Sequence, residues 1–153
     1  MEIIIGAKIL STIEYDLAAT AVTQTTHKIY KVVGLLISSG HEQVEKTLTV
    51  LDLPAKLKVL DAILEENKDS KFGGSIDLAL MNVQDIVDKI HEELKLIEKA
   101  IEYHKTKYLN SWRSLGCDKN IERLVIQRKI LDERFELFIK TLVLEKNNVV
   151  RQY

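Results

Sequence analysis

The sequence predicts an all-α fold, an up-down-up-down four-helix bundle with long helices, the second of them kinked or split at Pro54. The 153 residues include one proline and six glycines, too few turn residues for a fold with many strands. Apolar residues recur at alternating spacings of four and three for more than three heptads, starting at Ile76. With 46% hydrophobic and 29% charged residues, the composition fits one globular domain spanning 1–153.

The four helices are predicted at about 3–38, 41–66, 75–112 and 118–146. The first has a broad apolar face, wide enough to contact two neighbours, and Gly40 supplies its C-terminal cap. In the second, Pro54 lacks a backbone donor, so we expect either a kinked helix or two short ones. The short connections favour antiparallel neighbours.

The third helix is predicted to be the packing centre of the molecule. Ser75 is its expected N-cap, and Asp77 suits the positive end of its dipole. Its heptad seam consists of Ile76, Leu80, Val83, Val87, Ile90, Leu94, Ile97 and Ile101. The alternative architecture is an extended helical hairpin over residues 76–144 that pairs with another subunit.

The predicted fourth helix begins at an Asp118 cap, ends at Asn147–Asn148 and has two apolar stripes. The inner stripe is Ile121, Leu124, Leu131, Phe135, Phe138 and Leu142, with Arg128 at one inward position. The other stripe is Ile126, Ile130, Leu137 and Leu144, which align within about 40° at 100° per residue. A peripheral bundle helix needs only one apolar face. The second stripe is therefore predicted to bind a partner or a second copy, with burial in a less regular core as the alternative.

Aromatic and basic residues gather at the predicted end of the third helix, around Tyr108, Trp112 and Arg113. Such residues can form a protein-binding hot spot, or they can stack on bases and neutralise phosphates. The third interpretation is that Trp112 simply plugs the end of the bundle. The net charge of −1 argues against a dedicated nucleic-acid-binding protein.

One candidate buried polar pair is predicted, between Glu14 and Arg128. Glu14 falls inside the apolar face of the first helix, and a buried carboxylate is costly unless it is paired or protonated. We expect a structural ion pair or a glutamate reaching water. A perturbed catalytic acid is the alternative, but no second acid, nucleophile or donor cluster accompanies it.

Neither a metal site nor a cofactor is predicted. The four histidines are dispersed, and the Asp88–His91 spacing lacks a second Glu-x-x-His segment to complete a di-metal site. Cys117 precedes a helix and neighbours Lys119, conditions that lower a thiol pKa, but no Cys-His-Asn/Asp pattern surrounds it. A single cysteine forms no internal disulfide, so we expect a passive thiol and a reducing, cytoplasmic location.

The longest apolar run, Val32–Ile37, is far too short to span a bilayer, and we expect no secretory signal. The sequence therefore favours a non-enzymatic structural, assembly or adaptor protein that acts through protein–protein contacts. The alternative is a nucleic-acid-binding accessory protein that uses the bundle end around Trp112.

Overall fold

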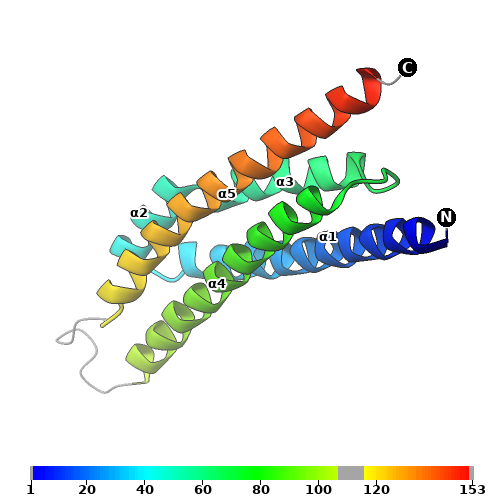
Figure 1. Ribbon diagram of the computed structural model, residues 1–153. Coiled ribbons are helices and arrows are strands. Elements are labelled where there is room, and N and C mark those ends of the chain that lie inside the picture. The colour runs from blue at the N-terminus through cyan, green and yellow to red at the C-terminus, as the bar shows by residue number, and fades with distance from the viewer. Residues whose placement is uncertain (1, 107–115, 152–153) are drawn as a thin grey trace.

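The computed structural model describes residues 2–106 and 116–151, and the side chains of residues 15–106 and 116–148. Within these ranges all regular structure is helical, and the helices form a bundle (Figure 1). They are α1 (Glu2–Ile37), α2 (Glu42–Leu51), α3 (Leu53–Glu66), α4 (Gly74–Lys105) and α5 (Asp118–Arg151). No helix in this part of the chain combines the length and apolarity that crossing a membrane requires.

Helix α4 is the centre of the packing, with α1 against one side and α5 against another, while α2 contacts both α1 and α5. All eight residues of the predicted α4 seam are buried: Ile76, Leu80, Val83, Val87, Ile90, Leu94, Ile97 and Ile101. The seam is therefore the spine of the core, as a sustained heptad repeat predicts.

Polar contacts join α4 and its preceding loop to α5 along their length. Glu93 accepts hydrogen bonds from Asn120 (2.8 Å) and Arg123 (3.1 Å). Further along, Arg134 pairs with Asp85 at 3.0 Å, and Glu145 accepts from the backbone N–H of Gly73 at 2.6 Å.

Residue numbers in these contacts fall along α4 while they rise along α5, so the two helices run antiparallel. Figure 1 shows the start of α1, the α3–α4 connection and the end of α5 toward one end of the molecule.

The segment predicted as the second helix forms two helices, α2 and α3. The helical conformation is interrupted at Asp52, two residues before Pro54. Asp52 adopts the left-handed conformation (φ 44°, ψ 50°), and α3 begins at Leu53 with Pro54 in its first turn. Proline is tolerated there because the N–H it lacks would have no helical partner. The break leaves the last carbonyls of α2 without helical donors.

Three predicted helix ends are wrong. Helix α4 ends at Lys105, with Thr106 as its C-cap, and not near residue 112. Helix α4 begins at Gly74, with Gly73 and not Ser75 as its N-cap, because the Glu145 carboxylate holds the Gly73 amide. Helix α5 continues past Asn147–Asn148 to Arg151. Asparagine is a weak helix former, but no glycine or proline follows to end the helix.

Tyr15 on α1 is a core residue that the periodicity did not single out. Its side chain is 1% exposed and packs edge-on against Phe72, with ring centroids 5.0 Å apart. Burial, with Asp16 and Asp77 nearby, raises its pKa to about 12, so the phenol stays neutral. Phe72 belongs to the α3–α4 connection, so this contact fastens that connection to α1.

Candidate partner-binding interface

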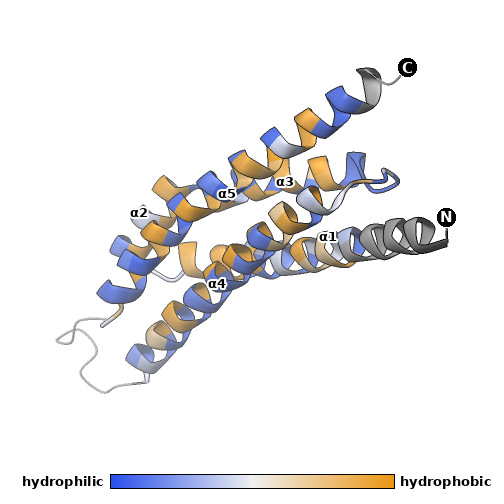
Figure 2. Cartoon of the chain, viewed as in Figure 1, coloured by the Kyte–Doolittle hydropathy of each residue, from blue (hydrophilic) through white to orange (hydrophobic). Residues whose placement is uncertain are grey.

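The second stripe of α5 lies on the surface of the molecule. Ile126 is 58% exposed, Leu137 55% and Leu144 64%. Ile130 differs, because it is half-buried and packs against the core. Figure 2 shows apolar residues recurring along α5, and Figure 1 shows the helix at the outer edge of the bundle. Three of the four predicted residues are therefore available for contact.

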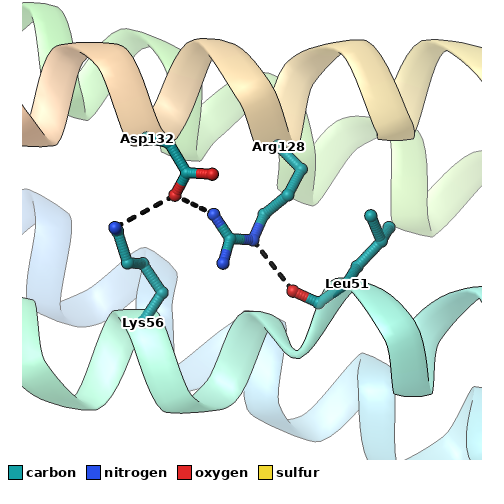
Figure 3. A network of polar contacts seen from close by, with 4 residues as sticks. All are labelled: Leu51, Lys56, Arg128 and Asp132. Atoms are coloured by element: carbon teal, nitrogen blue, oxygen red, sulfur yellow. Dashed lines mark hydrogen bonds and ion pairs between the residues drawn. The ribbon is translucent and has the colours of Figure 1, made fainter.

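The inner face of α5 is held to the α2–α3 junction by a polar network (Figure 3). Arg128 donates from Nε to the carbonyl oxygen of Leu51 at 2.9 Å and from a terminal nitrogen to Asp132. Leu51 is the last residue of α2, so this bond satisfies a carbonyl that the break at Asp52 leaves free. Lys56 of α3 pairs with Asp132 at 3.0 Å.

The charges of this network suit its position at the edge of the core. Burial alone would raise the pKa of Asp132, but hydrogen bonds from Lys56 and Arg128 hold it below the ordinary carboxyl value. The Lys56 ammonium also lies over the Phe135 ring, 4.7 Å from its centroid. The network therefore orients α5 with its second stripe outward.

The predicted pair of Glu14 and Arg128 stays a prediction. Arg128 is inward-facing and half-buried, as expected, and its partners among the described residues are the Leu51 carbonyl and the Asp132 carboxylate. The side chain of Glu14 lies outside the described residues. Asp132 and Leu51 were not foreseen as partners, although Asp132 stands one helical turn from Arg128, a spacing that favours ion pairs.

The predicted aromatic and basic bundle end also stays a prediction, because Tyr108, Trp112 and Arg113 lie outside the described residues. The rings of His41 and His104 meet edge to face, with centroids 5.8 Å apart. His104 is partly buried, as the α4 seam predicts.

A groove with a volume of about 600 Å³ lies between α1 and α3. It is lined by Asp16, Ala19, Thr20, Thr23, Gln24, His27, Asp61, Leu64, Glu65, Lys68 and Asp69. Asp61 accepts a hydrogen bond from the Tyr30 hydroxyl at 3.3 Å. Burial raises the pKa of Asp61 against the opposing effects of Tyr30, His27 and Thr23, and burial beside Asp61 raises that of Tyr30 to about 12.

The group in this groove with a shifted pKa is Asp61, a half-buried carboxyl that accepts a hydrogen bond from Tyr30. The part of the chain with described side chains contains no group of three or more His, Cys, Asp or Glu residues arranged to hold a metal ion. A tyrosine with its pKa raised to about 12 is a poor general base near neutral pH.

Cys117 is buried just before α5 and is not activated. Its side chain is 1% exposed, and burial, with a smaller contribution from Asp118, raises the pKa of its thiol. Desolvation of the thiolate has the largest effect on this pKa, although Cys117 neighbours Lys119 and a helix start. Cys117 is therefore a small residue of the hydrophobic core.

Comparison with known proteins gives little functional information. The chain is 35% identical over 65 residues to "Uncharacterized protein L717" of Acanthamoeba polyphaga mimivirus. The similar stretch covers 42% of this chain and 32% of the mimivirus protein, so the chain spans about a third of its relative's length. No protein-family model matches the sequence, and no solved structure matches it.

Proposed function

We propose that this protein is a non-enzymatic structural, assembly or adaptor protein that binds another protein chain through the outer face of α5. The observation that carries the proposal is the exposure of Ile126, Leu137 and Leu144 on one face of a helix whose opposite face is already packed. Burying exposed aliphatic side chains contributes about 1.5–3 kcal/mol each, before the cost of association.

The architecture proposed with it is an up-down-up-down bundle in which α2 and α3 together form the second rod. The antiparallel contacts between α4 and α5 support this arrangement. Pro54, in the first turn of α3, favours the break that places the Leu51 carbonyl against Arg128. A reducing, cytoplasmic setting is the proposed location and fits the free thiol of Cys117.

Site-specific photo-crosslinking in the native cells tests the function. A photoreactive amino acid replaces Leu137, and a matched protein carries it at Val59 of α3, which is 52% exposed. We expect an adduct from position 137, with the linked peptide identified by mass spectrometry, and little from position 59. Equal labelling at both positions, or no adduct at 137, would contradict the proposal.

A further inference from the structure

The exposed face of α5 carries a second heptad pattern that includes two charged residues. Glu133 and Lys140 fall on the same face as the apolar stripe, so the spacings alternate between four and three: Ile126, Ile130, Glu133, Leu137, Lys140 and Leu144. This alternation is typical of a helix that pairs with another helix. We define these six residues as the outer seam.

The two charges of the outer seam are available for an intermolecular contact. Glu133 is exposed and forms no ion pair with any described residue. Lys140 pairs with Glu136 at 3.0 Å, but both side chains are about two-thirds exposed. Exposed pairs of this kind hold their geometry weakly, so Lys140 can exchange its partner.

The order of charges on the outer seam distinguishes two ways of pairing α5 with itself. In a parallel pair, Glu133 meets a second Glu133 and Lys140 a second Lys140. In an antiparallel pair with its two-fold axis near Glu136, Glu133 comes level with Lys140 of the second copy to within about 2 Å, at 1.5 Å per residue. Opposite charges then meet twice, because a two-fold axis repeats every contact.

The apolar residues fit the same antiparallel arrangement. Leu144 of one copy comes level with the segment between Ile126 and Ile130 of the other, to within about 3 Å along the axis. Leu137 lies close to the axis and meets its own counterpart. The contacts made by Arg128 and Asp132 lie on the opposite side of α5 and hold the helix there. Five of the six outer-seam residues are exposed in the described part of the chain, and Ile130 is half-buried.

We propose that the outer seam binds a second copy of this chain, with the two α5 helices antiparallel and Glu133 of each copy paired with Lys140 of the other. This inference rests on the proposed function and names its partner. Self-complementarity of both charge and apolar surface is what an isologous two-fold interface requires.

Charge reversal, read by sedimentation equilibrium over a range of concentrations, tests the pairing. We expect the wild-type chain to dimerise, and Glu133→Lys and Lys140→Glu each to raise the dimer Kd by about tenfold or more, since each creates two like-charge contacts. The double variant Glu133→Lys/Lys140→Glu should recover the wild-type Kd. An equimolar mixture of the two single variants should dimerise better than either alone.

The matched controls are Glu66→Lys and Lys58→Glu, exposed positions on α3 that make the same changes in net charge. They should leave the dimer Kd unchanged. Circular dichroism and thermal unfolding verify that every variant folds. Single variants that dimerise as well as wild type would overturn the antiparallel pairing.

A wild-type chain that stays monomeric at all concentrations would overturn the inference without touching the proposed function. In that case an adduct between Leu137 and a different protein would still support protein binding by α5. Absence of any adduct at Leu137 would count against the proposed function itself.

Discussion

Single residues decide how α5 is seated on the bundle. Arg128 donates a hydrogen bond to the Leu51 carbonyl and forms an ion pair with Asp132. Lys56 forms a second ion pair with Asp132. Two of these residues come from α5 and two from the α2–α3 junction. The junction and the helix are thus fixed by the same few hydrogen bonds.

Replacing Arg128 by methionine tests this seat, because the change keeps the aliphatic stem and removes the donors. We expect the free energy of unfolding to fall by about 1–3 kcal/mol, the usual cost of leaving half-buried partners unsatisfied. Urea unfolding at one protein concentration measures it. Lys129→Met, at the exposed neighbouring position, should change it by less than about 0.5 kcal/mol. Equal effects of the two changes would show that the network contributes nothing.

Asp132 gives the network a pH dependence. Its pKa is lowered in the folded protein, so its stabilising effect is present above the ordinary carboxyl pKa and lost as pH falls through the folded value. Asp132→Asn should therefore destabilise the protein at pH 7, by less than about 1 kcal/mol for a half-exposed group. The difference from wild type should shrink as pH falls through the lowered pKa of Asp132 and be lost once the carboxyl is protonated. A difference that persists unchanged in acid would contradict the electrostatic explanation.

The buried thiol of Cys117 is expected to react slowly. Both burial and its raised pKa lower the fraction of reactive thiolate. Alkylation by iodoacetamide near pH 8 should be slower in the native protein than in urea by on the order of 100-fold. Mass spectrometry over time measures both rates. Comparable native and unfolded rates would show an accessible thiol.

Among the helices, α4 has the greatest influence on stability, because its seam packs against α1 on one side and α5 on another. Its seam residues are aliphatic, and their burial needs no polar partner. A substitution on this seam disturbs the packing of α1, α4 and α5 together, whereas a substitution on an exposed face of α4 leaves those contacts intact.

Ile90→Ala is expected to cost about 2–5 kcal/mol, because Ile90 is fully buried and the deletion leaves a cavity. Leu96→Ala, on the same helix but 47% exposed, is the control and should cost less than about 1 kcal/mol. Chemical unfolding of both variants compares them. A small loss for Ile90→Ala would mean that the core relaxes around the site.

At the scale of the whole molecule, association should stabilise the fold by mass action, because a dimer interface binds only the folded chain. Raising the wild-type concentration about a hundredfold should therefore raise the thermal midpoint by a few degrees. Differential scanning calorimetry at several concentrations measures the shift. The Glu133→Lys variant should show a smaller shift, and the Glu66→Lys control the full one. A midpoint independent of concentration for wild type would speak against self-association.

The sequence by itself determined that this protein is an all-α bundle with α4 as its spine, and it singled out the exposed stripe of α5. Both follow from periodicity, which is local: residues three and four apart share a helix face wherever the helix lies. It did not determine the groove between α1 and α3, the burial of Tyr15 against Phe72, or the partners of Arg128. These depend on the axial register between helices, and heptad patterns tolerate several registers.

Only the tertiary structure decided that the helix is interrupted at Asp52, where the Leu51 carbonyl accepts a hydrogen bond from the guanidinium of Arg128. It likewise decided that Leu137 and Leu144 are exposed, since the sequence left their burial in a less regular core as the alternative. The physical reason is that packing selects among faces and registers that the local sequence leaves equal in energy.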